Sequence, residues 1–150
     1  MINPQSQAGD DRLFSAHAIS LLRQEAARSA DTHLLRFDLP AFLYALCNGR
    51  LSAGQAVVDA SSGSTAISEA WFARLLGLPF IAVMPACTAP GKIHAVQALG
   101  ALCDLVDDPA EVHQRAAWHA ANGACHLDQF GLAERATDWR GNNNIAESII

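Results

Sequence analysis

The residues best suited to chemistry lie in one short loop, Ala60-Ser61-Ser62-Gly63-Ser64-Thr65. This loop runs from an apolar segment into a helical pattern, so consecutive backbone N–H groups, a helix N-terminus and several hydroxyls would converge there. Gly63 would let the main chain approach a ligand without a side chain in the way. The loop therefore predicts a cradle for a carboxylate or a phosphate. The alternative is an ordinary strand-to-helix turn capped by a serine.

Nucleotide-binding signatures are absent from the sequence. The loop lacks the Gly-Lys-Ser/Thr ending of a P-loop, and no Gly-x-Gly-x-x-Gly segment occurs for a dinucleotide. A nucleotide-binding domain is therefore the weakest of the functions considered.

A single lysine, Lys92, stands among the ten basic residues. Chemistry that needs an amine nucleophile has no other candidate side chain. Because Lys92 follows Pro90-Gly91 at a predicted helix start, the alternative is a solvated lysine without a chemical role.

The cysteines and histidines do not predict a metal site. The four cysteines, Cys47, Cys87, Cys103 and Cys125, are widely separated along the chain. No pair has the short spacing of a zinc site or a redox motif, and apolar neighbours favour core packing in a reducing compartment. Cys87, in a predicted loop, should be the most exposed. His113 and His119 share a predicted helix but not one face of it, and His126 falls on a predicted strand.

A repeat of strands and helices must position these residues. Apolar runs begin at nearly equal intervals, near Ala56, Pro79, Leu102 and Ala124. Helical patterns follow the first three runs, over 65–76, 91–99 and 109–122, and they close at Gly77, Gly100 and Gly123. Aspartate followed by proline is a common helix start, so Asp108 and Pro109 should begin the pattern over 109–122.

This repeat predicts an α/β fold, an open parallel sheet with helices on both faces. The expected strands lie near 56–60, 79–84, 102–106 and 124–128. Ligands of such sheets bind beyond the carboxyl ends of the strands, which is where the loop at 60–65 falls.

The segment before the repeat predicts further helices. An amphipathic helix is expected over 10–30, begun by Asp10 or Asp11, then an extended segment over 32–37 and a short helix over 41–48. We divide the chain into an N-terminal helix, residues 1–30, and one α/β domain, residues 31–150.

The composition limits the possible partners and the location. Hydrophobic residues make up 51% of the chain and charged residues 17%, and the formal net charge is −5. Nucleic acid and anionic membranes need a basic face, so neither is expected as a partner. The longest apolar stretch, 75–91, contains Gly77, Pro79 and Pro85 and cannot be a membrane-spanning helix. The first residues lack the pattern of a secretory signal, so we expect a cytoplasmic protein.

The motifs resemble those of a known enzyme family. Val57-Val-Asp-Ala-Ser-Ser-Gly-Ser-Thr-Ala66 and Leu78-Pro-Phe-Ile-Ala-Val-Met-Pro85 resemble the fold type II pyridoxal-phosphate enzymes, the group of cysteine synthase and cystathionine β-synthase. His126-Leu-Asp-Gln-Phe130 and residues 133–148 resemble its L-cysteine desulfhydrase-like branch. The resemblance covers about residues 31–150, and several motifs follow in family order and spacing.

This resemblance assigns roles to the loop. It implies that Ser61, Ser62, Gly63, Ser64 and Thr65 bind the α-carboxylate of an amino-acid substrate, together with Gln129. Ser64 also matches the position at which the wider family has an asparagine facing the 3-hydroxyl of pyridoxal phosphate. The resemblance assigns no catalytic residue and no metal ligand in this chain.

One segment of the family pattern is missing. In the family, the segment similar to 32–37 is followed by a strand and a Gly-Ser-x-Lys-type motif whose lysine holds the cofactor and moves the Cα proton. Here Leu39-Pro40 runs directly into Ala41, which resembles the end of the helix after that lysine. The pattern indicates an internal deletion near residue 40. The family's phosphate loop would fall beyond residue 150.

Two functions from different classes follow from this resemblance. The first is a pyridoxal-phosphate enzyme that performs β-elimination or β-replacement on cysteine or an O-activated serine and is inactive in this shortened form. The second is a non-catalytic relic or binding module that retains the carboxylate loop. The missing segments would normally cover one side of the sheet, so we also expect an exposed apolar patch and self-association.

Overall fold

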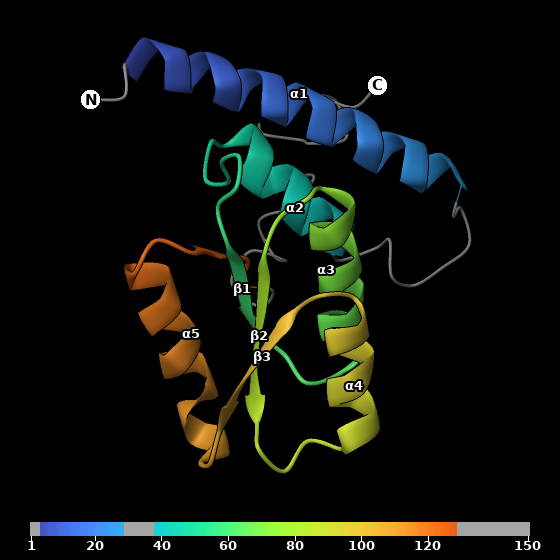
Figure 1. The fold of residues 1–150 in the computed structure, drawn as a ribbon, viewed down its shortest axis with the longest axis vertical. Helices are drawn as coiled ribbons and strands as arrows, with labels where there is room; N and C mark the ends of the chain where they lie inside the picture. Colours follow the sequence, from blue (N-terminus) through green and yellow to red (C-terminus); the bar gives the residue numbers. More distant parts are fainter. Residues whose placement is uncertain (1–3, 29–37, 129–150) are drawn as a thin grey trace, which may run out of the picture.

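The computed structural model describes residues 4–28 and 38–128, and a four-stranded parallel sheet lies at their centre (Figure 1). The strands are β1 (Val57–Ala60), β2 (Phe80–Pro85), β3 (Leu102–Val106) and β4 (Cys125–His126). Their order is β3-β2-β1-β4, with all three pairings parallel. The predicted α/β fold is confirmed. β4 is shorter than the predicted 124–128, and soon after it the chain turns at Asp128, whose φ is +45°.

The helices lie close to their predicted positions. They are α1 (Pro4–Arg28), α2 (Asp38–Cys47), α3 (Ser64–Leu75), α4 (Pro90–Ala98) and α5 (Val112–Ala121), the last preceded by a 3₁₀ turn over Pro109–Glu111. α1 begins before Asp10 and Asp11, so the prediction that one of these residues starts the helix is wrong. The extended segment predicted over 32–37 lies outside the described residues.

Glycine and aspartate end and start the helices as predicted. Gly77, Gly100 and Gly123 have φ values of +68°, +87° and +100°, the left-handed conformation that ends a helix without strain when no Cβ is present. Asp108 caps the 3₁₀ turn because its side chain accepts a hydrogen bond of 2.9 Å from the Ala110 N–H.

Both faces of the sheet are buried by helices. α3 and α4 cover one face together with α2, α1 packs over α2, and α5 covers the other face (Figure 1). β1 shows the alternation, because Val57 packs in the core beside α2 and α3 whereas Val58 packs with residues of α5. Such burial on both sides is typical of a parallel sheet.

The cysteines differ in exposure. Cys125 is buried and Cys103 is half-buried, as core packing requires, and Cys87 is exposed as predicted. The prediction that Cys47 packs in the core is wrong, because this residue ends α2 and is exposed. Within 4–28 and 38–128, no group of three or more histidine, cysteine or acidic side chains could hold a metal ion.

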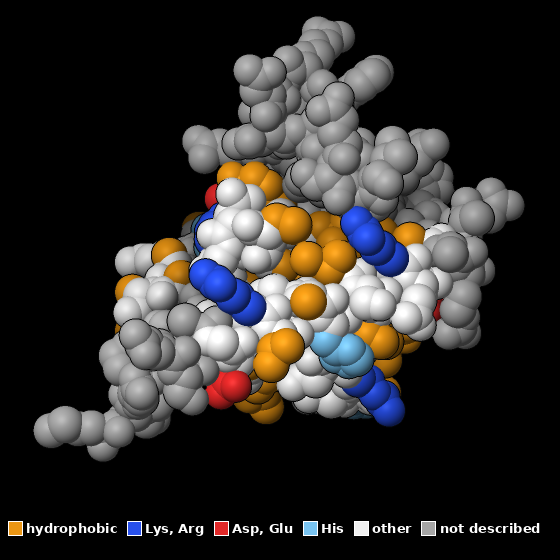
Figure 2. Space-filling view, turned by 90° about the horizontal axis from the view of Figure 1, so that it is seen from above, with side chains coloured by type: hydrophobic (Ala, Val, Ile, Leu, Met, Phe, Trp, Pro, Cys, Tyr) orange, Lys and Arg blue, Asp and Glu red, His pale blue; other side chains and the backbone are white. Residues whose placement is uncertain are grey.

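Two further observations concern possible surfaces. None of the helices described is long and apolar enough to span a bilayer. On the face seen in Figure 2, the lysine and arginine side chains that are described stand apart from one another, and hydrophobic side chains gather near its middle. This face therefore shows no basic patch among the described residues of the kind that nucleic acid needs.

Candidate functional site

The loop predicted from the sequence lies at the carboxyl edge of the sheet. It connects Ala60, the last residue of β1, to Ser64, the first residue of α3. The Ser61 N–H donates a 3.1 Å hydrogen bond to the Val83 carbonyl of β2, so the main chain stays extended to this residue. The Ser61 N–H is thus occupied, and the N–H groups that follow it are the ones a ligand could use.

The N-terminus of α3 has no side-chain cap. Gly63 occupies the capping position with φ −109° and ψ −154°, and among the described residues no side-chain cap hydrogen bond is made. The first turn also has no acidic residue to offset the positive end of the helix dipole. The alternative of a serine-capped turn is therefore not what forms here, and the open donors suit an anion.

The backbone conformation at residue 63 does not require a glycine. Its φ is one that any residue adopts, and a Cβ built on it would meet nothing within 4 Å. A glycine with this geometry leaves open space directly above the first turn of α3. A bound carboxylate could approach the main chain through that space.

The structure brings the predicted loop residues together in one continuous segment. Ser61, Ser62 and Thr65 are half-buried, and Ser64 is exposed. Gln129, the remaining predicted substrate-binding residue, lies outside the described residues.

A contact between a buried aspartate and a histidine beside the loop was missed by the sequence analysis. The Asp59 side chain is 3% exposed, and its Oδ1 lies 3.4 Å from Nε2 of His126 in β4. Arg50 extends this cluster, since its Nη2 donates a 3.4 Å hydrogen bond to the His126 carbonyl. Burial raises the pKa of the neighbouring Cys125 thiol, and the Arg50 charge acts in the opposite direction.

Lys92 lies in the first turn of α4 and has an exposed side chain. Because α4 follows β2, its first turn lies at the same edge of the sheet as the loop. The backbone N–H of Lys92 bonds to the Ala89 carbonyl at 2.9 Å, an ordinary helix-start contact. Its ammonium is a solvated charge, as the alternative interpretation predicted.

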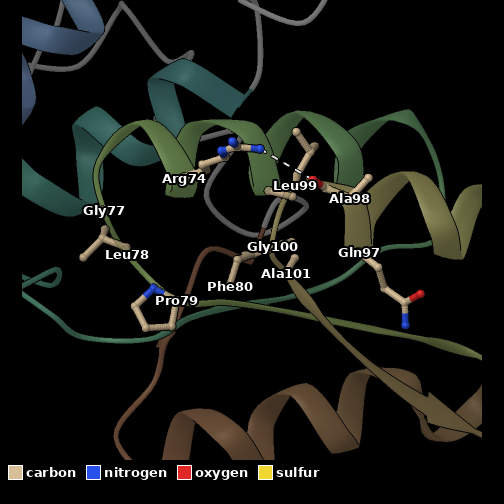
Figure 3. Close-up of a pocket in the computed structure, with 11 residues that line it drawn as sticks. Arg74, Gly77, Leu78, Pro79, Phe80, Gln97, Ala98, Leu99, Gly100 and Ala101 are labelled. Atoms are coloured by element: carbon tan, nitrogen blue, oxygen red, sulfur yellow. Dashed lines mark hydrogen bonds between the residues drawn. The ribbon is translucent and has the colours of Figure 1, made fainter.

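A groove lies at the opposite edge of the sheet. This groove of about 570 Å³ is lined by the turns before β2 and β3 and by Arg74, whose Nη1 donates a 3.5 Å hydrogen bond to the Ala98 carbonyl (Figure 3). Because ligands of parallel sheets bind beyond the carboxyl ends of the strands, this groove is not the candidate site.

The uncapped start of α3 and the open space at Gly63 are features that suit an anion. The sequence matches the family described as pyridoxal-phosphate dependent enzymes over residues 28–150. The chain belongs to this family. In its members, pyridoxal phosphate acts as the electron sink, and the protein orients the substrate.

Two relatives of this chain are named for reactions that consume or form cysteine. The chain is 48% identical over 170 residues to L-cysteine desulfhydrase Cds1 of Mycobacterium tuberculosis, covering 92% of this chain and 46% of the relative. It is 38% identical over 73 residues to a cysteine synthase of Aquifex aeolicus, covering 47% of this chain and 22% of that one. This chain therefore spans about half the length of the desulfhydrase that it matches.

A solved structure shows the same fold. A hydrogen sulfide-producing enzyme from Fusobacterium nucleatum superimposes with a TM-score of 0.62 at 20% identity, over 71% of this chain and 36% of that one. This likeness concerns the fold alone and agrees with the predicted fold type II domain.

The alignment with the desulfhydrase contains a gap. It spans 170 residues, although the whole of this chain has only 150 residues. The relative thus has residues within the matched region that this chain lacks. Their presence in the relative agrees with the internal deletion predicted near residue 40.

The described residues fit the substrate of this family better than its cofactor. Open N–H groups suit a carboxylate, but holding the cofactor aldehyde needs an amine placed against it. The one lysine of the sequence is the solvated Lys92. The described residues therefore have features that suit an anion, but they do not by themselves form a site for pyridoxal phosphate.

Proposed function

We propose that residues 61–65 form the substrate-carboxylate loop of a pyridoxal-phosphate enzyme that acts on cysteine or an O-activated serine. The observation that supports this function is the uncapped start of α3 at the carboxyl edge of the sheet. It occurs in a chain that is 48% identical to a cysteine desulfhydrase. The reaction class is β-elimination or β-replacement, in which the loop holds the carboxylate while chemistry occurs at the neighbouring carbons.

Individual roles in the proposed site follow the family pattern. Ser61, Ser62 and Thr65 supply hydroxyls, and Gly63 leaves room for the carboxylate. Gln129 adds an amide to the same carboxylate. Ser64, which is exposed, faces the 3-hydroxyl of the cofactor.

We further propose that this chain alone does not turn over cysteine. A lysine that forms a covalent bond with the cofactor works well when its pKa is lowered in a closed site. Lys92 is solvated instead, and loss of a positioned base typically costs about 10²–10⁴-fold in rate. The alternative function is a non-catalytic binding module, which the alignment gap relative to the desulfhydrase favours.

The test combines trapping and turnover. The purified chain and a Lys92→Ala variant are mixed with pyridoxal phosphate, treated with borohydride and analysed by mass spectrometry, and sulfide release from L-cysteine is measured in parallel. We expect no sulfide from either protein. Any adduct on the wild type should be slow and limited to Lys92 and the N-terminal amine. Sulfide release that Lys92→Ala abolishes would overturn the proposed inactivity and restore the enzyme function to this chain.

We also propose a cytoplasmic location and self-association. All four cysteines are free thiols, as in proteins of a reducing compartment. Self-association would use the outer edge of the sheet, where β3 has exposed apolar side chains. The net charge of −5 supports the expectation that neither nucleic acid nor an anionic membrane is a partner.

A further inference from the structure

The sequence contains two asparagine-glycine pairs, Asn48-Gly49 and Asn122-Gly123. In such a pair the glycine nitrogen can attack the side-chain amide of the asparagine, because glycine has no Cβ to obstruct the approach. The new N–Cγ bond forms as the Cγ–Nδ2 bond breaks, and ammonia leaves with the proton of the glycine nitrogen. Water then opens the resulting succinimide ring to aspartate or isoaspartate. Both pairs are exposed, so water reaches each of them.

The two pairs end two helices in the same way. Asn48 follows α2 and Asn122 follows α5, and each asparagine donates from Nδ2 to the carbonyl four residues before it, at 2.8 Å and 2.7 Å respectively. The glycines that follow have φ values of +65° and +100°, and their N–H groups bond to the carbonyl three residues back, at 3.2 Å and 3.1 Å. Attack by the glycine nitrogen needs these bonds to open, so the helix-end contacts protect both pairs to a similar degree.

A contact from outside the helix distinguishes the two turns. The Gly123 carbonyl accepts a 3.0 Å hydrogen bond from Nε2 of Gln55, in the segment before β1. Gln55 is itself held, because its Oε1 accepts a 3.0 Å hydrogen bond from the Ser52 N–H. Two residues after Gly123, the Cys125 N–H bonds to the Ala56 carbonyl at 2.7 Å as β4 begins. This turn is therefore fixed between α5 and the sheet.

The turn at 48–49 has no such outside contact. Within the part of the chain that the structure describes, the hydrogen bonds of Asn48 and Gly49 all go to α2 itself, and the Gly49 carbonyl accepts none. Helix ends open locally at a lower free energy than the core does. Opening this pair breaks contacts with α2 alone, whereas opening the pair at 122–123 also breaks the contact with Gln55.

We infer that Asn48 is a deamidation site of the folded chain and that Gln55 protects Asn122 from the same reaction. The product at residue 48 loses the Nδ2 donor to the Tyr44 carbonyl and gains a negative charge at the C-terminus of α2, where the helix dipole disfavours it. Isoaspartate also adds a methylene group to the main chain. This inference does not depend on the proposed function of the loop at 61–65.

The test follows both asparagines in one sample by peptide mapping with mass spectrometry. The chain is incubated at mildly alkaline pH, either folded or denatured in guanidinium chloride. In the denatured chain the two pairs should react at similar rates, since the contacts that distinguish them are gone. In the folded chain we expect Asn48 to react about fivefold faster than Asn122, the factor that corresponds to one additional hydrogen bond.

Gln55→Glu tests the protecting contact. A carboxylate still accepts from the Ser52 N–H but cannot donate to the Gly123 carbonyl. Deamidation at Asn122 should therefore rise about fivefold, while the rate at Asn48 stays unchanged. Gln24→Glu, at an exposed glutamine of α1, makes the same change of charge and should alter neither rate.

Amide hydrogen exchange of the wild type gives a second measurement that needs no variant. The Gly123 N–H should exchange about fivefold more slowly than the Gly49 N–H, after correction for their intrinsic rates. Equal rates of deamidation in the folded chain, or no reaction at Asn48 while the denatured chain reacts, would overturn the assignment of Asn48. Equal hydrogen exchange at the two glycines, or a Gln55→Glu variant that raises both deamidation rates together or neither, would refute the protective role of Gln55.

Discussion

At the scale of single residues, Gly63 is the position at which binding can be separated from folding. Its φ is ordinary and a Cβ would meet no neighbour, so Gly63→Ala should leave the unfolding free energy within about 0.5 kcal/mol of wild type. The added methyl group would fill the space through which a carboxylate reaches the N–H groups of α3. We expect L-serine, titrated by NMR against the amides of residues 64–66, to lose at least about tenfold in affinity, equivalent to about 1.4 kcal/mol.

Gly91 provides a matched control. It lies in the first turn of α4, also without a positive φ and with open space around a built Cβ. Gly91→Ala should fold like the wild type and bind L-serine with unchanged affinity. Equal binding by both alanine variants would show that the loop is not the anion site.

Asp104 gives a pH-dependent prediction. Partial burial raises the pKa of this carboxyl, but hydrogen bonds and charge from Arg115 (2.7 Å) and His119 (2.6 Å) outweigh it and leave the pKa below its usual value. The stabilisation is therefore full above the unfolded-state pKa of about 4 and is lost as the pH falls through the lower folded-state pKa. Asp104→Asn should cost about 1 kcal/mol at pH 7.

Urea unfolding of the wild type and Asp104→Asn measures this effect. The difference in unfolding free energy between the two proteins should shrink as the pH is lowered below about 4. A difference that stays constant over this range would mean that the carboxylate charge does not stabilise the fold.

The sequence could predict the loop but not the contact between Asp59 and His126 beside it. Five consecutive small residues between an apolar strand and a helix are a local pattern, and such patterns can be interpreted without knowing the fold. The contact between Asp59 and His126 depends on the order β1-β4, which places distant segments side by side. Cys47 shows the same limit, because its apolar neighbours indicate burial whereas its place at the end of α2 exposes it.

At the scale of elements, α3 is held by an aromatic contact with α2. Phe72 is 2% exposed, and its ring centroid lies 5.9 Å from that of Phe42. Phe72→Ala removes this contact and leaves a cavity, so we expect a loss of about 3–5 kcal/mol in unfolding free energy measured with urea. Leu13→Ala, at a side chain 73% exposed, should cost no more than about 0.5 kcal/mol.

The elements themselves were predicted well because their signals are local. Glycines in the left-handed conformation and Asp108 as a cap determine where helices end and begin. β4 was predicted too long, since an apolar run does not reveal how many of its residues find a partner strand. An apolar pattern also does not reveal the 3₁₀ turn before α5, because this turn depends on the Asp108 cap and on Pro109.

At the scale of the whole molecule, β3 forms an outer edge of the sheet among the strands that the structure describes. Three of the large hydrophobic side chains exposed among the described residues lie on or near this edge: Leu102 (66% exposed), Leu105 (44%) and Trp118 (52%). Natural edge strands are commonly protected by charges, but Asp104, the one charged residue of β3, is bonded to Arg115 and His119. This edge can therefore pair with the same edge of a second copy across a two-fold axis.

We expect sedimentation velocity to show a dimer whose population rises with protein concentration, because pairing of two β3 edges would bury these leucines and satisfy free backbone groups. Leu105→Lys places a charge in the middle of the contact and should shift the equilibrium towards monomer by about tenfold or more in dissociation constant. Leu13→Lys, at an exposed leucine of α1, is the matched control and should leave the equilibrium unchanged. A wild-type chain that stays monomeric at the highest concentration reached, or an equal shift in both lysine variants, would contradict association through β3.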